Sequence, residues 1–235
     1  MPYSAEISRA RPSCILFLID QSASMEDPFG GDRSRRKMHG VADAVNRLLH
    51  TLILRCTTAS GVKHAYDLGV VGYGREIRVG FSHDTLAGRE LAPISEVAEA
   101  PAEIETRTVK VEDGAGGLVT QEKRVPIWFR PVADGPTPMA AALEAALRIL
   151  QSWLPAHPDA FPPIVIHITD GDATDGDPLP KAKALQELGT TDGQVLLFNC
   201  HISDHAAQPV EFPATEEGLP DEFAKLLFRM SSVLP

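Results

Sequence analysis

This sequence has 235 residues, of which 43% are hydrophobic and 23% are charged, a balance that excludes a disordered chain. Its 22 Lys and Arg residues against 32 Asp and Glu give a net charge of −10, which repels nucleic-acid backbones and anionic membrane surfaces. No apolar run approaches the roughly 18 residues that a membrane helix needs. We therefore expect neither a nucleic acid nor a membrane as a partner.

The amino terminus and the three cysteines predict a cytoplasmic location. The apolar run at residues 14–19 is too short for the core of a signal peptide, and no small-residue cleavage site follows it. Cys14, Cys56 and Cys200 are odd in number, far apart and without a CxxC pair, so we expect reduced and mostly buried thiols.

Predicted strands alternate with predicted helices along the chain. Short apolar runs without alternation predict parallel strands at residues 14–19, 68–73, 164–168 and 195–200. Apolar residues at helical spacing predict helices at 35–55, 138–154, about 180–188 and 221–232, the last with Phe223, Leu226, Leu227 and Met230 inward. Further strands are expected at 75–81, antiparallel to 68–73, and at 210–213. The alternation indicates a doubly wound α/β fold with a mostly parallel sheet.

One region departs from this alternation. Residues 104–111 and 118–129 have strand character, and residues 113–117 supply the turn between them. We interpret the region at about 84–131 as an inserted β-hairpin. Residues 1–235 are therefore expected to form a single domain.

Oxygen-bearing side chains gather at one predicted edge of the sheet. A carboxylate and two hydroxyls alternate directly after the first strand, a second carboxylate follows the third long strand, and a hydroxyl precedes the second long helix. Open parallel sheets bind ligands at the carboxyl ends of their strands. Two carboxylates and three hydroxyls suit a small hard cation, typically Mg²⁺ with water completing an octahedron. The candidate metal ligands are Asp20, Ser22, Ser24, Thr137 and Asp170.

The order and spacing of these residues closely resemble the metal-ion-dependent adhesion site of the von Willebrand factor A family. That site is a DxSxS loop, a later Thr and a later Asp at the end of a strand, a pattern matched here by Asp20, Ser22, Ser24, Thr137 and Asp170. The resemblance covers nearly the whole chain outside the hairpin and implies the family's Rossmann-like fold. It is closest to stand-alone bacterial members grouped with tellurite-resistance-associated proteins. Such chains run further, so the resemblance leaves an early end of this sequence open.

The resemblance implies a Mg²⁺-dependent protein-interaction module. Neutral hydroxyls leave a dication incompletely neutralised, so an open coordination position attracts an Asp or Glu carboxylate from a partner protein. The implied setting is a bacterial regulatory or stress-response assembly. Genes of these relatives commonly lie beside a Ser/Thr kinase and a metal-dependent Ser/Thr phosphatase, or beside MoxR-type ATPases. Mn²⁺ or Ca²⁺ would also suit the oxygen ligands.

Two other functions stay open as alternatives. In a phosphoryl-transfer enzyme or a phosphoacceptor, Asp20 would be the nucleophile, but the sequence has Ser22 where a second acid is wanted and His201 where a Lys is wanted. In a structural protein, the metal loop would serve folding alone. We expect no enzyme.

Several neighbouring residues have both a structural and a functional interpretation. The four cations between residues 33 and 37 are interpreted as a solvated loop, or alternatively as a positive rim that steers an acidic partner. Trp128 and Phe129 are expected to pack the hairpin on its own domain, with an interface anchor as the alternative.

Other local assignments concern a helix start and three histidines. Thr137 is expected to cap the helix that begins with Pro138. His167 is expected to be buried and hydrogen-bonded. His201 and His205 have the spacing of a helical zinc pair but lack a third ligand.

Overall fold

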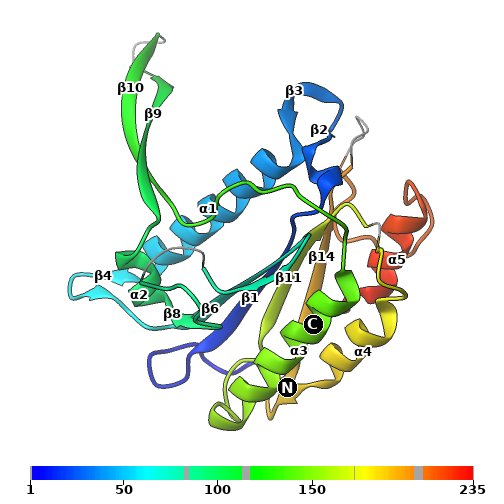
Figure 1. The fold of residues 1–235 in the computed structure, drawn as a ribbon. Helices are drawn as coiled ribbons and strands as arrows, with labels where there is room; N and C mark the ends of the chain where they lie inside the picture. Colours follow the sequence, from blue (N-terminus) through cyan, green and yellow to red (C-terminus); the bar gives the residue numbers. More distant parts are fainter. Residues whose placement is uncertain (1, 82–84, 113–116, 172, 204–208, 235) are drawn as a thin grey trace.

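The computed structural model describes residues 2–81, 85–112, 117–171, 173–203 and 209–234 (Figure 1). Its central sheet has the strand order β14-β11-β1-β6-β7, with β8 also paired to β6. The parallel strands are β1 (Ser13–Asp20), β6 (Tyr66–Tyr73), β11 (Ile164–Thr169) and β14 (Leu196–His201), and the antiparallel ones are β7 (Ile77–Val79) and β8 (Ala92–Pro93). This mostly parallel arrangement confirms the predicted α/β fold and the predicted antiparallel strand.

Helices cover both faces of the sheet. The helices α1 (Lys37–Cys56) and α2 (Ile94–Glu99) lie on one face, and α3 (Met139–Trp153), α4 (Leu179–Glu187) and α5 (Glu222–Met230) lie on the other (Figure 1). Alternate residues of β1 therefore enter two separate hydrophobic clusters, Leu16 with α3 and Phe17 with α1. Burial on both faces explains why this strand is apolar without alternation.

Short elements complete the chain. They are η1 (Ala23–Glu26), β2 (Pro28–Phe29), β3 (Asp32–Arg36), β4 (Thr57–Thr58), β5 (Gly61–Val62), η2 (Leu154–Ala156), β12 (Gly189–Thr190) and β13 (Gly193–Gln194). The hairpin of β2 and β3 lies between the loop after β1 and the start of α1, and it therefore positions the first residue of that helix. Within the described part of the chain, no helix is both long and apolar enough to cross a bilayer.

The predicted inserted hairpin consists of β9 (Glu103–Glu112) and β10 (Leu118–Ile127), which project from the body of the molecule (Figure 1). Of its predicted turn at 113–117, residues 113–116 lie outside the described residues. The base of the hairpin is anchored by Trp128, which is 2% exposed and donates a 2.6 Å hydrogen bond from Nε1 to the carbonyl oxygen of Val97. Trp128 and Phe129 thus pack on their own domain, as expected.

Asn46 of α1 holds the hairpin base in place. Its Oδ1 accepts hydrogen bonds from the backbone N–H groups of Trp128 (2.8 Å) and Phe129 (2.9 Å), and its Nδ2 donates to the carbonyl oxygen of Phe129 (2.7 Å). One buried side chain therefore satisfies three backbone groups that no sheet neighbour reaches.

Three local predictions were wrong. Residues 210–213 form no strand, because Pro209 and Pro213 lack N–H donors and no described strand pairs with them. Phe223 is 43% exposed, because α5 instead buries Ala224, Leu227 and Met230 along one stripe. Cys200 is exposed near the end of the edge strand β14, whereas the other two cysteines are buried free thiols as expected.

A buried polar chain crosses the sheet at His167, as the sequence indicated. The Tyr73 hydroxyl lies 2.6 Å from Nε2 of His167, whose Nδ1 lies 2.7 Å from Oδ1 of Asn199. Asn199 donates in turn to the carbonyl oxygen of Leu227 in α5. In the neutral tautomer with the proton on Nδ1, both ring nitrogens of His167 have partners.

Burial lowers the pKa of His167 from its usual 6.5 to about 4. The unfolded chain therefore takes up a proton at pH values where the folded chain does not, and stability is lost as the pH falls from about 6.5 towards 4. Between pH 7.5 and pH 5, we expect wild type to lose about 2 kcal/mol more unfolding free energy than His167→Gln, in which this site does not titrate. Urea denaturation of both proteins at both pH values measures the difference, and equal losses would contradict it.

Candidate metal centre

Asp20 stands at the carboxyl end of β1 with its carboxylate fixed in place. The parallel register sets Ile19 opposite Ile168, which brings Asp20 beside Thr169 at the end of β11. Oδ2 of Asp20 accepts a 2.6 Å hydrogen bond from the Thr169 hydroxyl. Oδ1 accepts a 2.8 Å bond from the backbone N–H of Ser22. Thr169, which sequence analysis did not identify, orients this carboxylate from the neighbouring strand.

The two serines of the loop lie together beside Asp20. The hydroxyl oxygens of Ser22 and Ser24 are 3.0 Å apart, at the start of the short helix η1. Ser22 is buried and Ser24 is half-buried.

A second loop brings Thr137 to the same place. The backbone N–H of Ala23 donates to the carbonyl oxygen of Gly135 (2.9 Å), which ties the loop before α3 to the serine loop. Gly135 has a φ of +83°, and a Cβ at this position would come within 2.5 Å of the Arg75 backbone nitrogen, so a glycine is required here. Thr137 itself is buried, and its backbone N–H and carbonyl both bond to Thr174, in the loop after β11.

The expected capping role of Thr137 was wrong. The residue before α3 is Pro138, which offers no side-chain hydrogen bond. The helix start is capped from another loop, because the Asp175 carboxylate accepts from the backbone N–H groups of Ala140 (3.0 Å) and Ala141 (2.8 Å). The Thr137 hydroxyl is therefore not used to cap this helix.

Asp170 completes the predicted set and has an unexpected partner. Its Oδ2 lies 3.2 Å from Nζ of Lys37, and the backbone N–H of Lys37 is bound by the carbonyl oxygen of Asp27. His201 donates from Nε2 to the backbone carbonyl oxygen of Asp170 (3.0 Å). The prediction of a solvated Lys37 was wrong, because the end of β3 turns this side chain inward at the first residue of α1. Of the proposed histidine pair, His205 lies outside the described residues.

The charges at the site favour the binding of a cation. Burial raises the pKa of Asp20, and the nearby Asp170 raises it further, although hydrogen bonds from Ser22 and Thr169 lower it. Among the described side chains, Lys37 pairs with Asp170, so two ionised carboxylates would leave one negative charge without a paired cation. A divalent cation would relieve this repulsion.

The donor set fits a hard cation such as Mg²⁺. Every candidate ligand offers oxygen, and Oδ1 of Asp170 is a buried atom with no hydrogen-bond partner among the described residues. Within the described part of the chain, the candidate centre included, no cluster of three or more His, Cys, Asp or Glu side chains has the arrangement of a metal site. The candidate centre has only two carboxylates, because its other three candidate ligands are hydroxyls.

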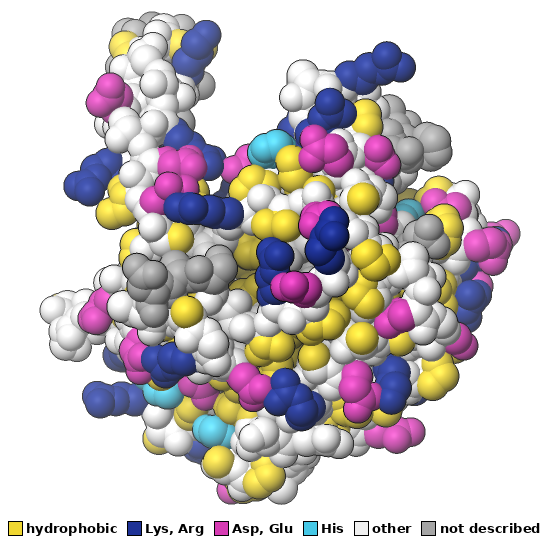
Figure 2. Space-filling model, viewed as in Figure 1, with side chains coloured by type: hydrophobic (Ala, Val, Ile, Leu, Met, Phe, Trp, Pro, Cys, Tyr) yellow, Lys and Arg dark blue, Asp and Glu magenta, His cyan; other side chains and the backbone are white. Residues whose placement is uncertain are grey.

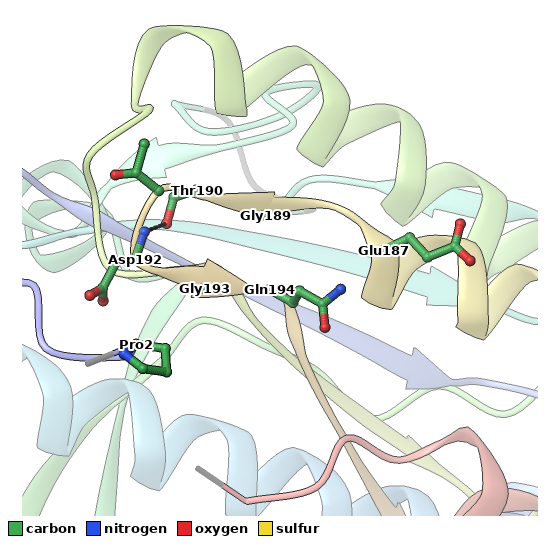
Figure 3. Close-up of a pocket in the computed structure, with 8 residues that line it drawn as sticks. Pro2, Glu187, Gly189, Thr190, Asp192, Gly193 and Gln194 are labelled. Carbon is green, nitrogen blue, oxygen red and sulfur yellow. Dashed lines mark hydrogen bonds between the residues drawn. The ribbon is translucent and has the colours of Figure 1, made fainter.

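A cavity of about 640 Å³ lies away from this centre (Figure 3). The hairpin of β12 and β13 lines it, directly before the amino end of β14, whereas the candidate ligands lie at the carboxyl ends of the strands. Its Asp192 carboxylate is already bound by the backbone N–H groups of Ser4 (2.9 Å) and Ala5 (3.0 Å). This cavity therefore adds nothing to the site.

Cationic side chains lie over the β2–β3 hairpin (Figure 2). Arg33 and Arg35 are exposed and Arg36 is half-buried, as expected for a solvated loop. Arg35 pairs with Asp43 (3.6 Å) and Arg36 with Glu26 (4.0 Å). These arginines stand next to Lys37 in the chain, and hence near the candidate centre.

Comparison with protein families finds no matching family, and comparison with curated proteins finds no significant match. Similar solved structures include a von Willebrand factor type A protein from Catenulispora acidiphila, with TM-score 0.45 and 19% identity over 80% of this chain and 33% of that one. Proximal thread matrix protein 1 of the mussel byssus has TM-score 0.45 and 19% identity over 83% of this chain and 39% of that one. The vWF domain of the type V pili tip protein Mfa5 from Porphyromonas gingivalis has TM-score 0.38 and 15% identity over 72% and 40%.

This chain thus spans about a third to two fifths of the length of these three chains. Two of these structures, the Catenulispora protein and the Mfa5 domain, carry the von Willebrand factor name. The fold assignment itself rests on the order and direction of the strands in this chain.

Proposed function

We propose that this chain is a protein-interaction module whose Mg²⁺ site binds an Asp or Glu carboxylate of a partner protein. The ligands in this proposal are Asp20, Ser22, Ser24, Thr137 and Asp170. The observation that supports it is the meeting of three loops at one edge of the sheet, where the serine loop is hydrogen-bonded to the loop before α3 and that loop to the loop after β11. Asp170, which follows β11, has a buried Oδ1 without a partner among the described residues.

The chemistry of the ligands explains the choice of partner. Hydroxyl ligands add no negative charge, so a bound dication keeps part of its charge and an open position for an outside carboxylate. Asp20 is held by two hydrogen bonds and does not need to rearrange. The arginines of the β2–β3 hairpin give a positive rim on a chain of net charge −10, which favours approach of an acidic surface at this place.

The biological setting follows from the sequence resemblance. We propose partners of the kinds encoded beside similar bacterial genes: a Ser/Thr kinase, a metal-dependent Ser/Thr phosphatase or a MoxR-type ATPase. The module would then act in the cytoplasm, in a regulatory or stress-response assembly. Its role would be adhesion between proteins and not catalysis.

Phosphoryl transfer through Asp20 is the less favoured alternative. Lys37 places a positive charge near the site, and phosphoryl-transfer enzymes use such a charge to neutralise the phosphate. However, Asp20 is 1% exposed, and both of its oxygens accept hydrogen bonds from the protein. A phosphoryl group is larger than a metal ion, so this burial hinders the approach of a phosphoryl substrate to Asp20 more than that of a cation.

Partner capture tests the proposal. We expect proteins of the native host to bind the immobilised chain in Mg²⁺ and to be lost in EDTA or with Thr137→Val, which removes one ligand hydroxyl at nearly constant shape. Thr51→Val, on the exposed side of α1, should bind as wild type does. A purified partner should lose binding when a single Asp or Glu is changed to its amide. Binding that is equal in EDTA and with Thr137→Val would contradict a metal-bridged interaction.

A further inference from the structure

A buried lysine lies against the candidate metal centre. Lys37 is 4% exposed, and its Nζ lies 3.2 Å from Oδ2 of Asp170, whose side chain is also largely buried. A buried lysine is rare without a paired charge, and here the pair is a proposed metal ligand. The ammonium therefore holds a carboxylate that the cation would also require.

The neighbouring cations of the same segment behave differently. Arg35 and Arg36 turn to Asp43 and Glu26, which are exposed or half-exposed. Lys37 follows them directly, yet its side chain is buried and its Nζ reaches Asp170. A general need for positive charge near the site would be met by the arginines alone, so the inward lysine needs a separate explanation.

We propose that the Lys37 ammonium is a built-in competitor of the divalent cation, an inference that rests on the proposed Mg²⁺ site. In the cation-free protein, the Lys37 ammonium neutralises the Asp170 carboxylate and keeps it from binding a cation. When the cation binds, it repels the ammonium at short range, and Lys37 leaves Asp170. Metal affinity is thereby kept weak, and the site is loaded only when the cation concentration, or a partner carboxylate, offsets the loss of this ion pair.

The position of Lys37 makes such a displacement feasible. It is the first residue of α1 and follows β3, so its side chain lies at a helix end where the flanking Arg36 already reaches solvent. Rotation about side-chain bonds would carry Nζ outward without moving the helix. The four-carbon stem can still cover apolar surface while its charged end is in water.

Calorimetric titration with Mg²⁺ tests the competition. Lys37→Met keeps the unbranched apolar stem and removes the charge, so we expect its dissociation constant to be at least about tenfold lower than that of wild type. Lys63→Met removes the same unit of charge from an exposed position beyond the other end of α1, where the Lys63 N–H donates to the carbonyl oxygen of Cys56, and should change the constant by less than about twofold. A lysine that orients Asp170 for the cation, or one that is purely structural, would give a different result, since its removal would weaken binding or leave it unchanged.

Amine labelling of the wild-type chain tests the displacement without any variant. Reductive methylation followed by mass spectrometry should modify Lys37 slowly in EDTA and several times faster in Mg²⁺. Equal Mg²⁺ dissociation constants for wild type and Lys37→Met, or labelling that Mg²⁺ does not change, would contradict competition by Lys37 while leaving the proposed metal site in place. Failure of Mg²⁺ to bind either protein would overturn the metal site as well.

Discussion

Asparagine in place of Asp20 is expected to abolish Mg²⁺ binding while making the cation-free protein harder to unfold. Asp20 is buried, and its pKa is raised by burial and by the neighbouring Asp170. Above that pKa the ionised carboxylate destabilises the folded state relative to a neutral side chain, because the folded protein holds the charge less favourably than the unfolded chain does. The amide removes this charge and retains an oxygen for the N–H of Ser22.

Denaturation in urea at neutral pH, with EDTA or Mg²⁺, measures both effects. In EDTA, Asp20→Asn should have the higher unfolding free energy. In Mg²⁺ at a hundred times the dissociation constant, wild type should gain about 2.7 kcal/mol and Asp20→Asn nothing. Glu26→Gln, an exposed charge change next to the loop, should keep the whole gain. An Asp20→Asn protein that still gains stability from Mg²⁺, or that is weaker in EDTA, would contradict this account.

Alanine in place of Asn46 is expected to cost roughly 3 to 6 kcal/mol of unfolding free energy, the largest loss we predict from a single side chain. Asn46 is buried and makes three hydrogen bonds to the backbone at the hairpin base. Alanine would leave two N–H groups and one carbonyl without partners, at roughly 1 to 2 kcal/mol each. No rearrangement within α1 could supply them, since alanine has no polar atom.

Urea denaturation should show this loss together with a red shift of tryptophan fluorescence as water reaches Trp128. Thr51→Ala, an exposed change on the same helix, should stay within about 0.5 kcal/mol of wild type. A loss below about 1 kcal/mol for Asn46→Ala would mean that the hairpin base does not depend on this side chain.

Patterns that arise from burial were predictable from the sequence. The four parallel strands and the long helices were predicted to within a few residues, because two-sided burial and helical spacing leave a direct mark on the order of apolar residues. The candidate residues could likewise be placed at one edge of the sheet, since parallel strands bring their carboxyl ends together, whereas their binding of a metal stays a prediction.

What could not be predicted depends on contacts between distant segments. Thr169 orients Asp20 only because β1 and β11 are neighbours, and Lys37 reaches Asp170 across 133 positions of the chain. Asn46 resembles any polar residue of a helix until the hairpin base packs beside it. The capping role given to Thr137 belongs to Asp175, which approaches the helix from another loop. No local pattern carries such information.

The projecting hairpin also bears on association between copies of this chain. β9 and β10 pair only with each other among the described strands, so each presents an open edge of backbone donors and acceptors. Such edges are sites where a second copy adds its own strand and aggregation begins. Eight of the twenty residues in these two strands are charged, and Pro126 removes one donor from β10. Strand addition by a second copy would bring those charged side chains together, so we expect the two edges to resist self-association.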